Sequence, residues 1–408
     1  MSLATENWRT PLIVIIAGCL ISMTGFGIRS SFGLFLEPMT VANDWARETF
    51  GLAMALQNLL WGIGLPIAGA LADKQGSVRV IVVGALMYAL GTWGMAEADS
   101  SMMLYLAGGV LNGLGIAFSA FTLAMAAMIR VVGPEKRSFV LGVGTAAGSL
   151  GQVVFSPISQ GFINAFGWHT ALLLLATIVL IMIPMAMCLP SSSNSSNPVN
   201  QSDQTLAEAV REALAHRGYI LLTTGFFVCG FHVAFITVHF PAYIKDLGLN
   251  PIIGAYAISV IGLMNILGSF ASGIAGQRWS KKCGLSVIYF GRALVILALL
   301  YAPKTPAVML LFAAAMGILW LSTVPLTTGI VAQVFGVRYM GTLFGIVFLS
   351  HQIGSFLGVW LGGRIFDQTG SYDGMWWAGI IVGVLAALVH LPINEKPLER
   401  LNTPATPG

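Results

Sequence analysis

Two arginines lie inside long apolar stretches of this 408-residue chain, where a charged side chain is costly. Arg29 falls about 18 residues into the apolar run that begins at Pro11, or roughly 27 Å along a helix. Arginine binds carboxylates through two parallel hydrogen bonds, so Arg29 favours the binding of an organic anion. The alternative is a structural arginine whose guanidinium reaches the nearer surface. Arg292 lies about eight residues into its stretch, and we expect it either to snorkel to the nearer surface or to form a structural pair.

Histidines are the second group of side chains that could do chemistry in these apolar stretches. His232 and His239 are seven residues apart and share one helical face, and His351 lies close to Gln352. All sixteen acidic residues fall in loops or at the ends of apolar stretches, so no deep carboxylate is available to carry a proton. His232 and His351 are therefore the candidate proton carriers. The alternative is that they only form hydrogen bonds between packed helices.

Three further residues stand out because polar side chains repeat around them at helical spacing. Ser and Thr at such spacing are explained by hydrogen bonds between helices. Asn112 and Gln152 are less easily explained in this way. Trp320 lies in the middle of its apolar stretch and suits an aromatic wall for a planar ligand.

The elements that position these residues follow from the composition. Charged residues make up 9% of the chain and hydrophobic residues 56%, with a mean hydropathy of +0.83. Soluble domains carry roughly 25% charged residues, and disordered chains have low hydrophobicity, so both classes are excluded. The sequence predicts a multi-pass protein of the lipid bilayer, in the cell (inner) membrane. The four cysteines are scattered and no nucleotide-binding or hydrolase motif is present, so we expect no enzyme, metal, cofactor or nucleic-acid partner.

Twelve apolar stretches are long enough to cross a bilayer as helices, and too long to be tilted barrel strands. With the N-terminus in the cytoplasm, 14 Lys and Arg residues fall on the inner side and 4 on the outer side. The fold class predicted is an all-α membrane protein with twelve transmembrane helices and both termini cytoplasmic. The stretches cover residues 11–36, 49–71, 78–96, 102–129, 138–163, 169–189, 219–243, 254–275, 284–302, 306–332, 340–365 and 373–393.

The spans divide into two halves that resemble each other. Residues 1–189 are predicted to form one six-helix bundle and residues 218–408 another, joined by a cytoplasmic linker at 190–217. The linker begins Ser/Asn-rich and ends with helical periodicity, which predicts a flexible segment followed by a surface helix. Similar segments recur at an offset of about 203 residues, which is typical of secondary transporters. By this offset His232 is the counterpart of Arg29.

The segment from Gly69 to Arg79, with Asp73-Lys74 and Gly76 between them, resembles the signature of loop 2–3 in the major facilitator superfamily. Within that superfamily the chain resembles the monocarboxylate and oxalate/formate branch. The resemblance implies the major facilitator fold and transport by alternating access. The resemblance to this branch rests on Ser31–Phe35, Trp45-Ala-Arg47, Lys136-Arg137, Gly142–Ser149 and Phe366–Tyr372.

The signature segment itself predicts a conformational latch made of Gly69, Asp73, Gly76 and Arg79. The two glycines permit a tight turn and close approach of the chain. Asp73 can cap a helix and pair with a cation in one conformation only. The alternative is a solvated charge in a loop.

One position departs from the branch. The resemblance implies an Asn-x-x-Gly-Arg segment in span 8, whose arginine binds the substrate carboxylate. Here Asn265 and Gly268 are followed by Ser269. Either Arg29 supplies the charge that binds an anion, or the substrate is not a small anion.

The sequence thus predicts a secondary transporter, present as a monomer, that moves a small organic solute by alternating access. The favoured substrate is an organic anion, with uptake by proton symport as a hypothesis. One alternative is an exporter of amphipathic or aromatic compounds, suggested by Ser269 and Trp320. Another is a membrane receptor or assembly factor that does not transport. The expected binding residues are Arg29, Asn112, Gln152, His232, Asn265, Trp320 and His351.

Overall fold

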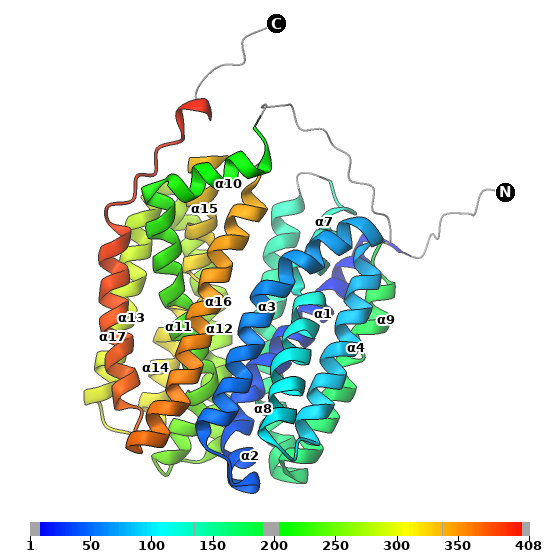
Figure 1. Ribbon diagram of the computed structural model, residues 1–408, viewed down its shortest axis with the longest axis vertical. Helices are drawn as coiled ribbons and strands as arrows, with labels where there is room; N and C mark the ends of the chain where they lie inside the picture. Colours follow the sequence, from blue (N-terminus) through cyan, green and yellow to red (C-terminus); the bar gives the residue numbers. More distant parts are fainter. Residues whose placement is uncertain (1–8, 134–135, 191–203, 337, 402–408) are drawn as a thin grey trace, which may run out of the picture.

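The computed structural model describes residues 9–133, 136–190, 204–336 and 338–401, and the regular structure within these ranges is helical (Figure 1). Eleven helical segments in this part of the chain are long and apolar enough to cross a membrane. The α-helices are α1 (Pro11–Ser31), α2 (Leu36–Asn43), α3 (Arg47–Gln75), α4 (Ser77–Ala96), α5 (Ser101–Leu104), α6 (Asn112–Phe118), α7 (Phe121–Ile129), α8 (Arg137–Val179), α9 (Met182–Met187), α10 (Leu206–Ala215), α11 (Arg217–Asp246), α12 (Pro251–Arg278), α13 (Lys281–Tyr301), α14 (Pro306–Leu319), α15 (Thr323–Phe335), α16 (Met340–Thr369) and α17 (Asp373–His390).

The longest apolar segment is interrupted by a glycine. Val140–Met187 contains 48 residues, and Gly167 within it has φ 79° and ψ 166°, which is not helical. An unbroken helix of that length would measure about 72 Å, more than twice the hydrocarbon core of a bilayer. The interruption lies between the two spans predicted at 138–163 and 169–189. Eleven candidate spans are therefore observed, and the count of twelve stays a prediction.

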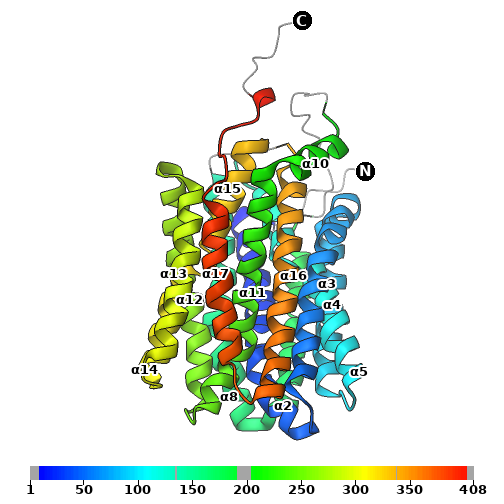
Figure 2. The ribbon, with the colours of Figure 1, turned by 60° about the vertical axis from the view of Figure 1, so that its left-hand side comes forward.

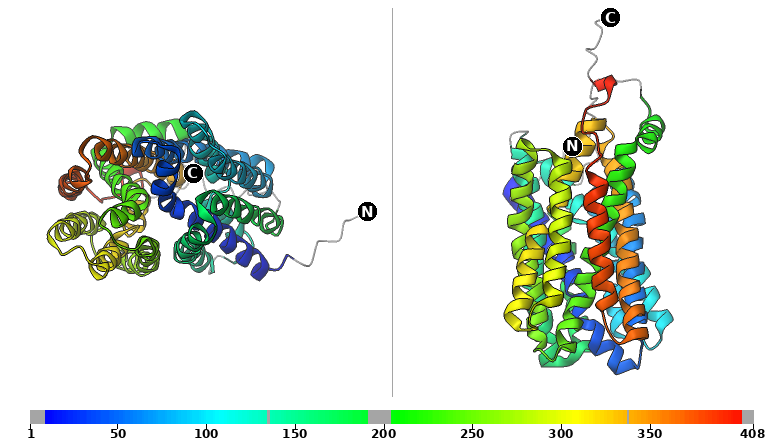
Figure 3. Two further views of the ribbon diagram at one scale, coloured as in Figure 1. Left: turned by 90° about the horizontal axis from the view of Figure 1, so that it is seen from below. Right: turned by 90° about the vertical axis from the view of Figure 1, so that its left-hand side faces the viewer.

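The helices form two groups that lie side by side (Figure 3). Buried apolar residues form two clusters, one drawn almost entirely from residues 14–189 and the other from residues 213–393. We call α1–α9 the N-terminal group and α10–α17 the C-terminal group. Between the groups, α3 packs against α16 and α8 against α12. The division of the chain into two six-helix bundles, with its boundaries, stays a prediction.

The starts of α1 and α11 and the end of α17 lie at one end of the molecule (Figure 1). Helix α10 lies across the same end (Figure 2), within the stretch predicted as a surface helix. It begins with a capping box, in which Thr205 and Glu208 bond to each other's backbone amides. The Ser/Asn-rich part of the predicted linker, residues 191–203, lies outside the described residues.

Two helices are broken at corresponding places in the two groups. The chain leaves the helical conformation between α6 and α7 at Ser119 and Ala120, and between α14 and α15 at Trp320. The two breaks are separated by nearly the same offset as the sequence repeat. Such breaks expose backbone N–H and C=O groups inside the protein, and these groups need partners.

Candidate functional site

Arg29 lies near the middle of a span. The segment that contains it continues through a short 3-10 turn into α2, so the whole span is Pro11–Asn43, 33 residues long. The predicted span ended at residue 36, seven residues before this helical segment ends at Asn43.

The Arg29 guanidinium is held by α3. It donates a hydrogen bond to Asn58 Oδ1, and its Cζ lies 4.6 Å from the centroid of the Trp61 ring. Asn58 and Trp61 are three residues apart and therefore share one helical face. No carboxylate of the described residues forms an ion pair with Arg29. The positive charge is thus oriented by an amide and an aromatic ring, and it is not neutralised.

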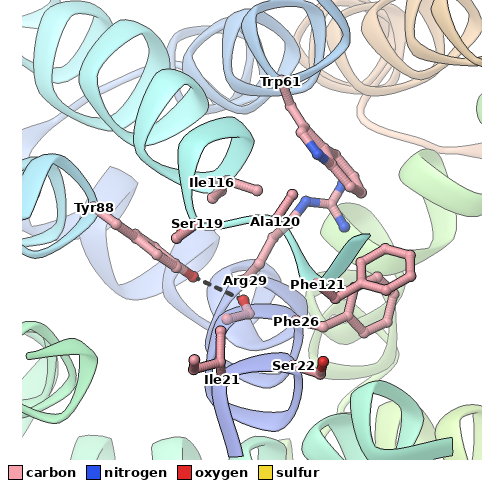
Figure 4. A pocket seen from close by; sticks show the side chains of 11 residues that line it. Ile21, Ser22, Phe26, Arg29, Trp61, Tyr88, Ile116, Ser119, Ala120 and Phe121 are labelled. Atoms are coloured by element: carbon pink, nitrogen blue, oxygen red, sulfur yellow. Dashed lines mark hydrogen bonds between the residues drawn. The ribbon is translucent and has the colours of Figure 1, made fainter. Parts of the chain in front are cut away.

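A small cavity of about 20 Å³ lies beside Arg29. Its walls come from α1, α3, α4 and the chain around the α6–α7 break. Figure 4 shows the guanidinium of Arg29 next to the Trp61 ring, with Ala120 and Phe121 close by and Tyr88 on the far wall. A cavity of this size admits about one water molecule or one oxygen atom of a ligand.

Aromatic contacts join this cavity to the C-terminal group. The rings of Trp61 and Phe348 meet edge to face, with centroids 5.3 Å apart, and Phe348 is stacked on His351 at 5.7 Å. His351 Nδ1 lies 3.2 Å from Gln352 Oε1. Two of the predicted site residues, Arg29 and His351, are therefore connected across the interface between the groups. The connection runs through the contacting rings of Trp61 and Phe348.

Gln152 and Asn265 lie at a second contact between the groups, where α8 meets α12. Asn265 Nδ2 donates to Ser149 Oγ at 2.9 Å, and Gln152 packs against Gly262 one turn away. Asn265 Oδ1 also accepts from the backbone N–H of Leu321, at 2.9 Å, in the α14–α15 break. Asn265 therefore connects the broken helix to the interface between the groups.

Three other predicted site residues lie inside the helix groups. Asn112 is fully buried and contacts Thr92 and Met95 of α4. His232 is 2% exposed, and its Nε2 lies 2.8 Å from the carbonyl oxygen of Gly379 in α17. Trp320 is 1% exposed and belongs to the core of the C-terminal group. None of the three lines the Arg29 cavity.

The signature segment forms the turn between α3 and α4. Gly76 has φ 88°, a conformation that favours glycine. Asp73 lies 3.9 Å from Arg130 of the same group, but its side chain is 75% exposed, so the pair contributes little. A side chain at Gly69 would meet open space, and Arg79 is exposed. The close approach expected at Gly69 is absent from this conformation, and the latch stays a prediction.

Arg292 occupies the structural position that the sequence suggested. It is fully buried and donates to the carbonyl oxygens of Leu319, at 2.7 Å, and Trp320, which end α14. A cation at the C-terminus of a helix also complements the helix dipole. Arg292 therefore supports the α14–α15 break.

Asn58, Trp61 and Phe121 were not predicted from the sequence as neighbours of Arg29. A signal for the first two exists, because an asparagine and a tryptophan one turn apart occur within an apolar span. Phe121 carried no such signal, since its importance comes from the helix break before it.

Comparison with known proteins decides the family. The family model described as Major Facilitator Superfamily matches residues 15–359. The chain belongs to the Major Facilitator Superfamily. It is therefore a multi-pass membrane protein and a transporter of small solutes, and not an enzyme.

Among curated relatives, this transporter is 26% identical to monocarboxylate transporter 13 of Bos taurus, over 95% of this chain and 91% of that protein. It is 23% identical to an MFS-type transporter of Escherichia coli, over 86% of this chain and 87% of that protein. The predicted resemblance to monocarboxylate transporters is confirmed by these relatives.

Solved structures show the same fold. The transporter matches a bacterial homologue of the lysosomal transporter Spinster, with a TM-score of 0.76, 15% identity and coverage of 95% of this chain and 97% of that one. It matches a D-xylose–proton symporter with a TM-score of 0.73, 15% identity and coverage of 97% and 100%. The predicted major facilitator fold is thereby confirmed, and alternating access is consistent with it.

Proposed function

We propose that this transporter carries a small organic anion, a carboxylate, which binds at Arg29. One observation carries the proposal: a guanidinium lies near the middle of a span, beside a cavity, and has no carboxylate partner among the described residues. An unneutralised charge at this depth is costly unless a ligand supplies the opposite charge. An anion that binds there recovers part of that cost.

The arginine expected in span 8 is absent, which makes Arg29 the natural substitute. Ser269 stands at that position, and its hydroxyl donates to Asn265 Oδ1 at 3.1 Å. A serine carries no charge, so it cannot replace an arginine in binding a carboxylate. The printed names of relatives such as monocarboxylate transporter 13 support a monocarboxylate substrate. In this proposal the charge that binds the substrate carboxylate is in span 1, at Arg29, and not in span 8.

The direction and coupling belong to the same proposal. With both termini cytoplasmic, the end of the molecule where α2 and α11 finish is the outer end. The protein then works as a monomer in the inner membrane and takes up the anion together with a proton. His351 is the proposed proton carrier, because the Trp61–Phe348 contact links it to the Arg29 cavity.

Export of aromatic compounds is less well supported. That alternative rested on Trp320 as a cavity wall and on Ser269. Trp320 is buried in the core of the C-terminal group, and Ser269 is bonded to Asn265. A receptor without transport would bind carboxylates but give no uptake, so it would be recognised in the uptake experiment described next.

The test is uptake into proteoliposomes of a panel of radiolabelled monocarboxylates, including pyruvate, lactate and benzoate, with glucose and thymidine as neutral compounds. We expect at least one carboxylate to be accumulated by the wild type, and uptake to fall at least tenfold in Arg29→Gln. Arg211→Gln is the matched control, because Arg211 is an exposed arginine of α10. Uptake of neutral compounds alone, unchanged in Arg29→Gln, would contradict the proposal.

A further inference from the structure

We infer that the carboxylate group binds in a subsite made of the N-terminus of α7, the indole of Trp61 and the guanidinium of Arg29. This inference rests on the proposed function and says which further atoms recognise the anion. The subsite is the small cavity described above, and all three elements line it.

The first component is the start of a helix that points into the protein. Helix α7 begins at Phe121, and Ala120 before it is the N-cap residue, with φ −56° and ψ 141°. An alanine has no oxygen with which to cap the helix, and no side-chain cap bond is formed. The first N–H groups of a helix, here those of Phe121 and Thr122, have no acceptor within it. They also carry the positive end of the helix dipole, which attracts anions.

The second component is a buried donor that lacks an acceptor. The Trp61 side chain is 6% exposed, and its Nε1 has no hydrogen-bond partner among the described residues. Arg29 Nε is likewise buried without a partner there. Buried donors nearly always have partners, so two unpaired donors on one cavity indicate a missing acceptor. Figure 4 shows both side chains beside the α6–α7 break.

The hydroxyl groups of the cavity are already used. Tyr88 donates to the carbonyl oxygen of Gly25 at 3.2 Å. Ser22 and Ser119 each donate to a carbonyl oxygen of their own helix, at 2.9 and 2.7 Å. What stays available in this cavity is therefore a set of N–H donors together with a positive charge. An oxyanion matches both properties, whereas a neutral ligand or a cation does not.

The size of the cavity fits one oxygen atom of a carboxylate. Its volume of about 20 Å³ is too small for a whole substrate. The subsite therefore recognises the head of the substrate, and the rest of the molecule lies outside this cavity. Trp61 has two roles, because its ring also lies against the Arg29 guanidinium and holds it in place.

Formate is the smallest probe of such a subsite, and formamide is its neutral counterpart. The experiment measures the unfolding temperature of the detergent-purified protein against rising sodium formate at constant ionic strength, because a ligand of the folded state raises it. Phe121→Pro removes one helix N–H. Proline is tolerated at the first helical position, and the extended Ala120 suits the residue before a proline. Phe121→Ala removes the same ring but keeps the N–H, so it is the matched control.

We expect formate, but not formamide, to stabilise the wild type. Phe121→Pro should raise the half-maximal formate concentration on the order of tenfold, and Phe121→Ala about twofold or less. Trp61→Phe keeps an aromatic ring and removes the indole N–H. We expect this variant also to raise the half-maximal formate concentration on the order of tenfold. This second variant keeps the test decisive where Phe121→Pro fails to fold.

Two results would overturn the subsite. In the first, formate binding is unchanged in both Trp61→Phe and a folded Phe121→Pro, whereas Arg29→Gln abolishes it. Arg29 then binds the anion without the helix N-terminus and the indole, and the proposed function is retained. The other is a wild type that does not respond to formate although it transports larger carboxylates. Failure of the proposed function is a different result, in which the proteoliposomes take up no carboxylate.

Discussion

Arg47 of α3 and Asp246 of α11 form an ion pair with two hydrogen bonds, Nη1 to Oδ2 at 2.6 Å and Nη2 to Oδ1 at 2.7 Å. The pair joins the N-terminal group of helices to the C-terminal group at the end opposite the start of α1 (Figure 1). Paired planar groups of this kind are the strongest form of charged hydrogen bond. Lys245 and Glu37 form a second ion pair between the groups, next to the first.

The same end is joined by a backbone contact. The carboxylate of Asp367 accepts hydrogen bonds from the backbone N–H groups of Arg47, at 3.0 Å, and Glu48, at 2.6 Å, so a residue of α16 caps the start of α3. Arg47 also donates to the Tyr372 hydroxyl at 2.9 Å. Two segments that carried the family resemblance, Trp45-Ala-Arg47 and Phe366–Tyr372, therefore meet in space although about 320 residues separate them. Together they join the two groups of helices at this end of the molecule.

Removing the Asp246 charge should favour conformations that are open at this end. Asp246→Asn loses the ion pair, whose side chains are 12% and 29% exposed. A partly solvated pair contributes about 1 kcal/mol, which corresponds to a population change of roughly fivefold. The measurement is the rate at which a membrane-impermeant maleimide labels a cysteine introduced at Val238, which is buried between the two groups. We expect labelling to become several-fold faster in Asp246→Asn.

Two comparisons make that result specific. Asp99→Asn removes an exposed acidic residue from the loop after α4 and should leave the rate unchanged. Exchange of the two charges, Arg47→Asp with Asp246→Arg, should restore part of the slow labelling. Equal rates in Asp246→Asn and Asp99→Asn would show that the Arg47 pair does not hold this end closed.

Asn265 should contribute more to stability than the serine to which it bonds. Asn265→Ala leaves the Leu321 N–H in the α14–α15 break without its acceptor, which costs about 1–3 kcal/mol. Ser149→Ala removes one bond between the groups, the one it accepts from Asn265, and such bonds in membranes average about 0.6 kcal/mol. Asn265→Ala removes that bond together with those from Leu321 and Ser269. The unfolding temperature in detergent should therefore fall clearly for Asn265→Ala and slightly for Ser149→Ala.

The double variant shows how much of the loss in Asn265→Ala comes from the Ser149 bond. Because the Ser149 bond is already lost in Asn265→Ala, adding Ser149→Ala should cost almost nothing more. Similar losses in the two single variants would mean that the Leu321 contact is unimportant. The break would then be supported by other groups.

Much of the fold could be predicted because helix ends carry local signals. Prolines at the first turn of α1, α12 and α14, and Gly76 after α3, mark boundaries that the structure places within a few residues of the predicted ones. The Arg29 position also follows from sequence, since an arginine in an apolar run is visible without a structure. What the sequence misjudged is how far that span continues, because the 3-10 turn at Phe32–Phe35 keeps the chain buried.

The surroundings of the predicted site residues could not be read from the repeat. His232 corresponds to Arg29 by the offset of 203, yet it contacts Gly379 of α17 and does not line the cavity. A repeat matches backbone positions, whereas the surroundings of a side chain depend on residues from other helices. Trp61 illustrates the same point, because a tryptophan in an apolar span also suits a lipid-facing position. Only the contacts of Trp61 with Arg29 of α1 and with Phe348 of α16 assign it to the Arg29 cavity.

Arg292 should be needed for stability and not for recognition of the anion. Arg292→Met replaces the guanidinium by the apolar end of another long, unbranched side chain. The carbonyl oxygens of Leu319 and Trp320 then lack this donor. We expect the free energy of unfolding to fall by about 1–3 kcal/mol, with Arg292→Lys intermediate because lysine retains a charge near the helix C-terminus.

Formate binding distinguishes the two arginines. In folded Arg292→Met the half-maximal formate concentration should stay within about twofold of the wild type, since Arg292 does not line the cavity. In Arg29→Gln formate binding should disappear while the unfolding temperature does not fall. Loss of formate binding in a stable Arg292→Met would contradict the assignment of separate roles.

His351 should determine whether uptake responds to a proton gradient. It lies at the interface between the groups, 7% exposed, with its Nδ1 3.2 Å from Gln352 Oε1 and 3.5 Å from Ser355 Oγ. His351→Gln keeps a polar side chain of similar reach but cannot carry a proton. In that variant, an inward proton gradient should no longer stimulate uptake of the transported carboxylate. Exchange of labelled for unlabelled carboxylate should continue within about threefold of the wild type, because exchange needs no net proton movement.

His232→Gln is the matched histidine control. His232 is buried inside the C-terminal group and bonded to the Gly379 carbonyl oxygen, so it has no route to the Arg29 cavity through the contacts of Trp61 and Phe348. Its replacement should leave the stimulation by a proton gradient intact. The opposite pattern, with the gradient response lost in His232→Gln and kept in His351→Gln, would move the proton site into the C-terminal group and away from the anion. An intact response in both variants would mean that the proton is carried by another group or by the substrate itself.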